Sequence, residues 1–349
     1  MRTPATDFIL KMSKNPDAKG LDLAHQLEAY LQQRFGAAVN VDDLARLAGG
    51  ASNETWAFNV HIEGGGSYAL VMRKAFSSGL LDEGMAAEYA LLKALWEQGT
   101  PVPKPRWYES GSDSSLGGAF MIMDRSQGVD VRKAMAKDQL SVDQMGLKLA
   151  SIQAQIHSIP FQELPIDVVD GNDYSRRQLE IWTEKYQRFD QGRWPMLSLA
   201  CHWMAGHVPD LNRPALVHGD FKANNLLCDK DDVTGVIDWE MAHIGDPIED
   251  LAWTMLWQTP FDLVGGMMSE AAYINAYQES GGNTVEPARL LFWRIFSWFK
   301  LGVIFLTGVE SGAGKGPRPV LLQLGRSLPF VESKLAENLL QVLDRGGDR

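Results

Sequence analysis

Cysteine is nearly absent from this sequence. The two cysteines, Cys201 and Cys228, are far apart in the chain, and neither belongs to a Cys-x-x-Cys pair. Disulfide frameworks and structural zinc sites need more numerous or more closely spaced cysteines. The composition therefore predicts a fold that is held together by neither device.

Basic residues are scarce relative to acidic ones. The chain has 33 Lys and Arg against 44 Asp and Glu, which gives a net charge of −11. Proteins whose main partner is nucleic acid usually present a basic face to its phosphates. We therefore expect no nucleic-acid partner.

Long uninterrupted apolar runs are also missing. The first residues, MRTPATDFILKMSKNP, lack the apolar core of a signal peptide. The most apolar stretch, LFWRIFSWFKLGVIFLTGV at 291–309, is interrupted by Arg294 and Lys300, which favours a buried helix over a membrane span. We expect a cytoplasmic protein with no membrane partner.

What the sequence does contain is typical of a folded chain of two lobes. With 349 residues, 45% hydrophobic and 22% charged, it is too long for one small core. Apolar residues recur at helical spacing in 21–35 and 82–98, whereas 55–62, 67–75 and 119–123 have strand patterns. Beyond about residue 126 the pattern is mostly helical. A small sheet-rich N-terminal part and a larger helical C-terminal part are therefore predicted.

The stretch from 216 to 253 contains two short apolar segments, and each of them is followed directly by polar residues. Asp220 is followed five residues later by Asn225, and Asp238 comes thirteen residues after that, at the end of VTGVID. This spacing matches the kinase pattern of a proton-accepting Asp, an Asn and a separate metal-binding Asp. It predicts that Asp220 is the base, that Asn225 and Asp238 bind Mg²⁺, and that Lys222 reaches the γ-phosphate of ATP.

Parts suited to nucleotide binding occur upstream. In AGGASNE at 48–54, the backbone of Gly49, Gly50 and Ser52 is suited to lie over phosphates. Arg73 and Lys74 are adjacent in a predicted strand, so they must point to opposite faces.

Glu88 lies on the apolar stripe of the next predicted helix, with Met85 and Leu92. A carboxylate on a buried stripe needs a cation as a partner. The preceding strand offers one.

These motifs resemble the aminoglycoside phosphotransferase and choline kinase-like family. The resemblance covers about residues 40–310, and HGDFKANN, VIDWEMAHIGDP and LVMRK are most similar to the branch that also occurs fused to acyl-CoA dehydrogenases. It implies an α+β, protein-kinase-like fold of two lobes: a small antiparallel-sheet N-terminal lobe for the nucleotide, at 1–125, and a larger, mostly helical C-terminal lobe for catalysis and substrate, at 126–349.

The resemblance also implies site residues and cofactors. ATP and Mg²⁺ would be the cofactors, Asp220 the base, and Asn225 and Asp238 the metal ligands. Arg73 stands where most of the family has a phosphate-positioning lysine, and Glu88 would be its partner; a register shift would give this role to Lys74 instead. The segment from Met123 to Arg125 would be the hinge whose backbone binds adenine.

The partner implied is a small molecule with a hydroxyl group. A hydroxyacyl thioester or hydroxy acid derivative is the first expectation, with a functional link to an acyl-CoA dehydrogenase. The alternatives are an aminoglycoside or other amino alcohol as acceptor, or a nucleotide-binding module without catalysis.

Several polar residues are expected to have structural roles. Asp246, Pro247 and Glu249 fit the N-cap, first and third positions of a helix. Asp250 and His157 are interpreted as structural as well. His218 is expected to orient the loop that carries Asp220.

Overall fold

A computed structural model describes residues 18–47, 53–75, 82–111, 114–168, 173–189, 191–211, 213–256, 263–313 and 322–346. Their contacts divide the chain into two units. The first consists of the described residues up to Val129 together with Leu227–Glu240, and the second of Asp130–Leu226 and the described residues from Met241 onward.

This division differs from the predicted boundary at 125/126 in two respects. The first boundary falls a few residues later, and the segment Leu227–Glu240 returns to the first unit. Hydrogen bonds explain the return: the backbone N–H of Val236 donates to the carbonyl of Pro101 at 2.6 Å, and the Thr234 hydroxyl donates to the carbonyl of Gln127 at 2.6 Å. Pairings of this kind cannot be read from one boundary in the sequence.

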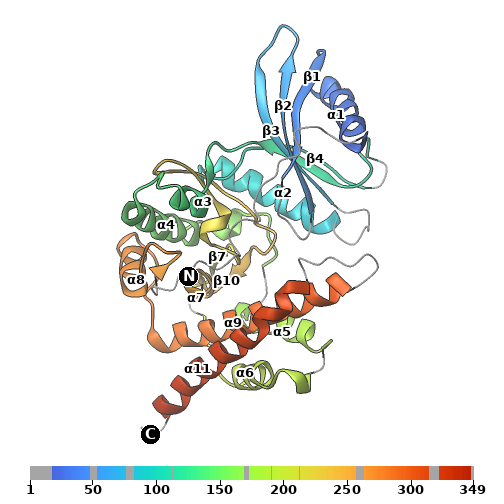
Figure 1. Ribbon diagram of the computed structural model, residues 1–349. Helices are drawn as coiled ribbons and strands as arrows, with labels where there is room; N and C mark the ends of the chain where they lie inside the picture. Colours follow the sequence, from blue (N-terminus) through green and yellow to red (C-terminus); the bar gives the residue numbers. More distant parts are fainter. Residues whose placement is uncertain are drawn as a thin grey trace. The chain divides into compact units, whose positions relative to one another are not determined.

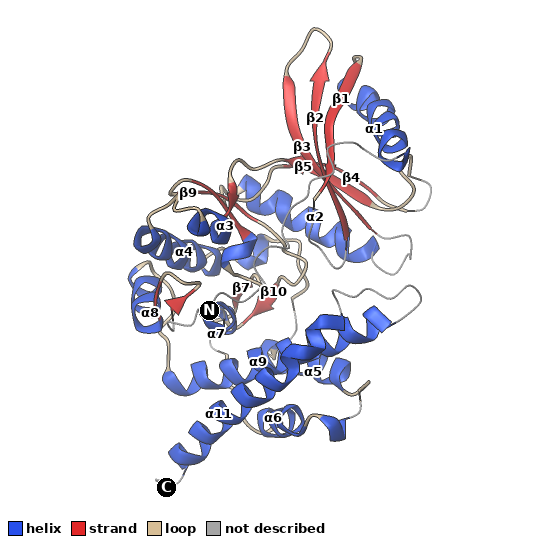
Figure 2. Cartoon of the chain, viewed as in Figure 1, coloured by secondary structure: helices blue, strands red, loops and turns tan. Residues whose placement is uncertain are grey.

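The first unit is built on an antiparallel sheet in the order β1-β2-β3-β5-β4 (Figures 1 and 2). Its strands are β1 (Val39–Arg46), β2 (Asn53–Ile62), β3 (Ser67–Ala75), β4 (Pro105–Glu109) and β5 (Phe120–Asp124). The predicted strands at 55–62 and 67–75 are confirmed as β2 and β3, which form an antiparallel hairpin from Asn53 opposite Ala75 to His61 opposite Ser67. A further small sheet contains β6 (Val129–Asp130), β8 (Leu226–Asp229) and β9 (Asp232–Val236).

Strands β1 and β4 were not predicted, because neither has a clean apolar alternation. The pairing of β1 with β2 is irregular between Asp42 and Ala45, where Asp43 has a φ of 50°. Strand β4 begins with proline, and all five of its residues are only partly buried. Pairing in the sheet makes these segments strands, although their patterns do not predict it.

Two helices accompany this sheet, α1 (Ala18–Phe35) and α2 (Asp82–Glu97). Leu27 and Leu31 of α1 belong to one buried cluster with Leu70 and Met72 of β3. Because side chains alternate along a strand, Arg73 points to the face opposite Met72, where it meets α2. The two faces of β3 therefore serve different purposes, packing on one and charge pairing on the other.

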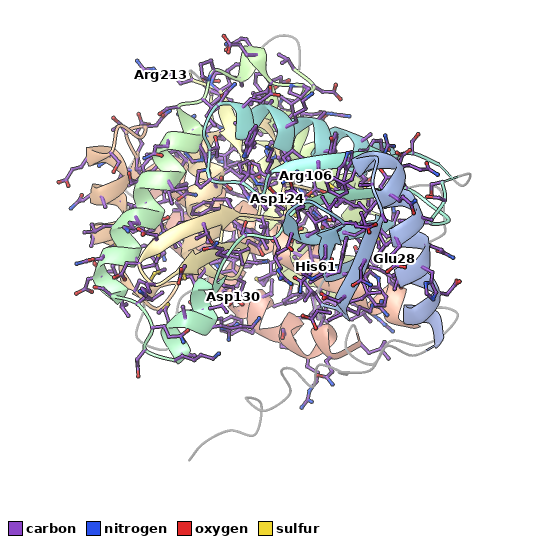
Figure 3. The ribbon with its side chains drawn as sticks, turned by 90° about the horizontal axis from the view of Figure 1, so that it is seen from above. Glu28, His61, Arg106, Asp124, Asp130 and Arg213 are labelled. Carbon is purple, nitrogen blue, oxygen red and sulfur yellow. The ribbon has the colours of Figure 1, made fainter. Side chains whose placement is uncertain are left out.

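A charged pair joins the edge strand β4 to β5. Arg106 of β4 and Asp124 of β5 lie beside each other, and the Arg106 Nη2 group donates to Asp124 Oδ2 at 3.0 Å (Figure 3). The same guanidinium lies 4.6 Å from the centre of the Tyr68 ring. This pair ties the end of β5 to the neighbouring strand.

The second unit is mostly helical, as predicted (Figure 2). Its helices are α3 (Val131–Ala136), α4 (Val142–His157), α5 (Tyr174–Tyr186), α6 (Pro195–Ala205), α7 (Pro247–Leu256), α8 (Glu270–Glu279), α9 (Pro287–Ala313) and α11 (Leu328–Gly346). Short 3₁₀ helices occupy Phe161–Glu163, Gln191–Arg193, Ala223–Asn225 and Gln323–Ser327, and two strand pairs are formed by β7 (Ala215–Val217) with β10 (His243–Gly245) and β11 (Leu263–Val264) with β12 (Met268–Ser269).

Helix α9 contains the apolar stretch that was expected to be a buried helix. It is long and apolar enough to cross a membrane, but 72% of its most apolar window is buried within the protein. The core helix of a folded unit passes the same test of length and hydropathy, so the burial fits the prediction. Lys300, in the middle of this helix, is itself 1% exposed.

Candidate active site

The carboxylate of Asp220 is held by four hydrogen bonds. Strand β7 is fully buried and ends just before His218, so the loop that follows starts from a rigid support. Lys222 Nζ donates to both carboxylate oxygens at 2.8 Å, Asn225 Nδ2 donates to Oδ2 at 2.7 Å, and the indole N–H of Trp253 donates to Oδ1 at 2.8 Å. These donors hold the carboxylate in one orientation, which is what a positioned base requires.

Three of the predicted residues are therefore brought together. Asp220, Lys222 and Asn225 form one hydrogen-bonded group, whereas Trp253 was not predicted to be near them. Helical spacing puts Trp253 on the same face of α7 as Asp250, three residues earlier, but the sequence carries no signal that this face meets the loop.

Helix α7 anchors this loop through one of its sides. Asp250 accepts the backbone N–H groups of His218 and Gly219, both at 2.9 Å. The Thr254 hydroxyl donates to the carbonyl of Phe221 at 3.0 Å. Together with Trp253, these contacts come from positions i, i+3 and i+4 of the helix, so a single buried face fixes the loop.

Gly219 is required by the shape of this loop. Its φ is +79°, and a Cβ at this position would lie 2.5 Å from the carbonyl oxygen of Met241. Any other residue would be strained and would also clash with backbone. The glycine of the His-Gly-Asp motif is therefore explained by geometry.

Asp250 has the structural role expected of it, and its environment is strongly polar. It is fully buried and also contacts His157 Nε2 at 3.2 Å. Burial by itself would raise the pKa of its carboxyl, but the hydrogen bond and charge of His157, with the contribution of His218, lower that pKa to about 2. His157 is held on its other side by the Tyr277 hydroxyl at 2.8 Å, as expected for a packed histidine.

We predict that Asp250→Asn destabilises the protein and slows turnover together. An amide has one oxygen, so it cannot accept from both backbone N–H groups and His157 as the carboxylate does. The loss of buried charge-assisted hydrogen bonds should lower the free energy of unfolding by about 3 kcal/mol. Chemical denaturation and steady-state kinetics on the same preparation measure both effects, and an unchanged midpoint would contradict the anchoring role.

The cap at the start of α7 is confirmed. Asp246 Oδ1 accepts the N–H of Ile248 at 3.0 Å, and Asp246 Oδ2 accepts from Arg289 and from the indole of Trp293, both at 2.6 Å. Asp246 is fully buried, which raises the pKa of its carboxyl in spite of the Arg289 guanidinium. It is a structural residue, as predicted.

In the first unit, Arg73 is surrounded by carboxylates. It forms an ion pair with Glu88 of α2, and its Nη2 lies 3.5 Å from Asp238 and 3.5 Å from Glu240. Burial of Glu88, reinforced by the nearby charges of Asp238 and Glu240, raises the pKa of its carboxyl to about 7, although Arg73 acts in the opposite direction. Glu240 was not among the predicted site residues. The one sequence feature that could have indicated it is its position two residues after Asp238.

The choice between Arg73 and Lys74 is settled for the ion pair. Arg73 pairs with Glu88, whereas the Lys74 ammonium donates to the backbone carbonyl of Leu116 on the opposite face of the strand. The prediction that Glu88 pairs with Arg73 is therefore confirmed. Contact of Arg73 with phosphates stays a prediction.

We predict that Arg73→Ala lowers both stability and ATP affinity, and that Lys74→Ala does much less of either. Removal of one partner of a buried ion pair costs about 3 kcal/mol or more. The loss should be larger at pH 8 than at pH 6, because Glu88 without its cation has a still higher pKa, and stability from a raised carboxyl pKa is lost as the pH rises through it.

Thermal unfolding at the two pH values and titration with ATP test this pair of variants. Arg73→Lys is the conservative control and should keep partial activity, since lysine retains the charge but not the planar fork. A greater loss of ATP affinity in Lys74→Ala than in Arg73→Ala would show that Lys74 is the phosphate ligand.

Asp238 and Asn225 each present an oxygen suited to Mg²⁺. Asp238 has a φ of +71°, an uncommon conformation for a residue with a side chain, and its carboxylate is 37% exposed. Asn225 directs its amide N–H₂ to the side chain and carbonyl of Asp220, so its oxygen is the atom left for a cation.

Within the described residues, no group of three or more His, Cys, Asp or Glu side chains is arranged to hold a metal ion alone. Mg²⁺ is commonly held by one or two protein ligands together with substrate phosphates. Asp238 and Asn225 each supply an oxygen of the kind that such an ion takes, and their assignment as Mg²⁺ ligands stays a prediction.

The predicted hinge is only partly compatible with the structure. Arg125 donates its backbone N–H to the carbonyl of Ala69 at 2.9 Å, and Met123 lies opposite Val71 in the sheet. The Arg125 amide is therefore already used within the sheet, and binding of adenine by the backbone of Met123 to Arg125 stays a prediction. The predicted phosphate-loop residues Gly49, Gly50 and Ser52 lie outside the described residues.

Comparison with known proteins agrees with these features. Residues 43–293 match the phosphotransferase enzyme family. Acyl-CoA dehydrogenase family member 11 of Homo sapiens is 30% identical over 302 residues, which are 80% of this chain and 38% of the relative. The protein of the same name from Pongo abelii is 33% identical over 238 residues, 65% of this chain and 30% of the relative. The chain thus spans well under half the length of these relatives.

Solved structures share the fold. An aminoglycoside phosphotransferase, APH(4)-Ia, superimposes with a TM-score of 0.61 at 19% identity, covering 90% of this chain and 98% of that one. The macrolide 2′-phosphotransferase MphH of Brachybacterium faecium gives a TM-score of 0.58 at 20% identity, covering 84% and 96%. The match over most of the chain, the kinase-like fold and the Asp220 loop together show that this chain belongs to the phosphotransferase enzyme family.

Proposed function

We propose that this protein is an ATP- and Mg²⁺-dependent kinase that phosphorylates a hydroxyl group of a small molecule. The observation that carries the proposal is the Asp220 carboxylate, oriented by Lys222, Asn225 and Trp253 on a loop that α7 holds in place. A nucleotide-binding module without catalysis would have no use for a carboxylate held in this way.

The chemistry assigned to each residue follows from its surroundings. Asp220 accepts the proton of the acceptor hydroxyl as the new P–O bond forms and the bond from the γ-phosphorus to the β-γ bridging oxygen breaks, so ADP leaves. Arg73 contributes positive charge to the phosphates while Glu88 holds its guanidinium. Bound Mg²⁺ would neutralise phosphate charge, and Asp238 and Asn225 would hold it.

The relatives support a nucleotide and a small acceptor. APH(4)-Ia has been solved with AMP-PNP and hygromycin B, and APH(2″)-IIIa with GDP and kanamycin. The relatives named as acyl-CoA dehydrogenase family members favour a hydroxyacyl thioester or hydroxy acid as the acceptor, together with a functional link to an acyl-CoA dehydrogenase.

A screen of acceptors with an ATP-consumption readout tests this function. It should include hydroxyacyl-coenzyme A thioesters with the hydroxyl at successive carbons, free hydroxy acids, choline, kanamycin and hygromycin B. We expect consumption with the thioesters or hydroxy acids, and a phosphorylated product detectable by mass spectrometry. Consumption with an aminoglycoside alone would favour the second acceptor class, and nucleotide binding without consumption on any acceptor would contradict the proposed activity.

A further inference from the structure

Lys300 is a buried cation in the middle of the core helix α9. It is 1% exposed, and its neighbours Phe299 and Leu301 are buried and apolar. Transfer of an ammonium group from water into a protein core costs free energy, and well-packed apolar residues often stabilise such positions as well or better. The stability of the core therefore gives no reason for a lysine at this position.

The hydrogen bond of Lys300 is made to the loop that carries Asp220, and not to the nearby carboxylate. Its Nζ donates to the backbone carbonyl of Gly219 at 2.9 Å, whereas Glu249 Oε1 lies 3.6 Å away. Among the described residues, this carboxylate oxygen has no hydrogen-bond partner although it is buried. The ammonium thus balances the charge of Glu249 while it donates to the peptide group that precedes Asp220.

This peptide group needs an anchor of its own. Gly219 has a φ of +79° and no side chain, so the peptide bond between it and Asp220 is less restricted than a bond after any other residue. Asp250 holds only the N–H groups of His218 and Gly219, which precede this bond. Lys300 holds its carbonyl oxygen, and His218 Nδ1 accepts its N–H, that of Asp220, at 3.2 Å. Both polar atoms of the peptide group are therefore fixed, one of them from α9.

A second contact of Lys300 leads to the same carboxylate. Its Nζ lies over the ring of Trp253, 4.7 Å from the ring centre, and the Trp253 indole N–H donates to Asp220 Oδ1 at 2.8 Å. A cation over the face of the ring restrains the plane of the indole and, with it, the direction of the N–H. One ammonium group therefore acts on Asp220 by two routes, through the backbone before it and through a donor to its side chain.

We propose that Lys300 is a positioning residue for the base: its ammonium fixes the peptide bond to Asp220 and the plane of the Trp253 indole, and so the orientation of the carboxylate. The role of Asp220 as base rests on the proposed function, whereas the attachment of the loop to α9 rests on the contacts alone. Loss of the ammonium should lower turnover and leave nucleotide affinity unchanged, because the expected nucleotide ligands Arg73 and Asp238 belong to the first unit.

Three variants separate this role from a purely structural one. Lys300→Met keeps a side chain of similar length without the ammonium, and it leaves Glu249 buried without its cation. Glu249→Gln removes the ion pair but keeps the bond from Lys300 to Gly219. The double variant Lys300→Met/Glu249→Gln removes both charges, so it should recover most of the stability that Lys300→Met loses.

Turnover and stability should separate in these variants. We expect kcat for ATP consumption to fall about ten- to hundredfold in Lys300→Met, as for the loss of one charge-assisted hydrogen bond, with the dissociation constant of ATP unchanged. The double variant should keep this low kcat although its melting temperature recovers, and Glu249→Gln should turn over like the unmodified protein. Recovery of kcat together with the melting temperature, or a normal kcat in Lys300→Met, would make Lys300 a structural residue and overturn the inference.

A double-mutant cycle with Asp220→Asn tests the route through the base. If Lys300 acts through the Asp220 carboxylate, Lys300→Met should lower the residual turnover of Asp220→Asn much less than it lowers that of the unmodified protein. A loss by the same factor in both backgrounds would show that the two residues act independently, which would contradict a positioning role.

Hydrogen exchange tests the attachment of the loop without any turnover. Backbone amides at 218–222 should exchange about tenfold faster or more in the double variant than in Glu249→Gln, while those of the β2–β3 hairpin in the first unit stay unchanged. Unchanged exchange in the loop would overturn the inference. Faster exchange in a protein that consumes no ATP with any acceptor would support the attachment by Lys300 and contradict the proposed kinase activity.

Discussion

Replacement of Asp220 by asparagine is expected to lower the turnover number by about two to four orders of magnitude, the usual contribution of a positioned base. Asparagine has nearly the same shape, but its amide cannot accept a proton from the substrate hydroxyl. Nucleotide affinity should stay within about a few fold, because the expected nucleotide ligands Arg73 and Asp238 are unchanged.

The measurement is steady-state turnover together with an equilibrium titration of ATP. Asp143→Asn is a suitable control, since Asp143 is an exposed acidic residue in the first turn of α4. Thermal unfolding of both variants separates chemistry from folding, because Asp220 also accepts four hydrogen bonds that the asparagine would satisfy less well. Turnover near that of the unmodified protein would remove Asp220 from the role of base.

The second large effect is expected at Asp238. Asp238→Ala should abolish the Mg²⁺-dependent part of ATP binding and, with it, turnover, because bound Mg²⁺ would neutralise phosphate charge and Asp238 is its only predicted carboxylate ligand. The positive φ of this residue complicates the alanine variant, since a left-handed conformation costs roughly 1–2 kcal/mol for most residues.

Asp238→Asn resolves this difficulty. Asparagine tolerates the left-handed conformation, so the backbone should be preserved while the negative charge is removed. We expect a large loss of Mg²⁺ dependence in both variants, with a lower melting temperature in the alanine variant. Asp229→Ala, in the same returning segment, is the control because Asp229 is exposed. A Mg²⁺ titration that is the same in Asp238→Asn as in the unmodified protein would place the metal elsewhere.

The roles of Arg73 and Glu88 illustrate how far a local pattern can reach. Strand alternation requires that Arg73 and Lys74 point apart, and the helical stripe of α2 requires that Glu88 be buried. A buried carboxylate needs a cation, so the ion pair could be predicted without knowledge of the sheet order. The two further carboxylates near Arg73 were not predicted in this way. Asp238 was expected only as a metal ligand, and Glu240 was not expected near Arg73 at all.

The hinge shows the opposite case. The apolar pattern of 119–123 places Met123 to Arg125 at the end of a strand, but the use of each backbone donor depends on which strand lies alongside. Because β3 pairs with this end of β5, the Arg125 amide is occupied. The sequence contains no local signal for that pairing.

The sequence by itself determined the fold class, the family, the kinase motif around Asp220 and the need of Glu88 for a cation from the preceding strand, because each rests on spacing along one strand, loop or helix. The tertiary structure alone decided which distant side chains complete these groups. Trp253 and Asp250 reach the Asp220 loop from α7, Lys300 reaches Gly219 from α9, and 227–240 joins the first unit through hydrogen bonds to remote backbone. Contacts of this kind join residues tens of positions apart, and only the packing of helices and strands brings such residues within hydrogen-bonding distance.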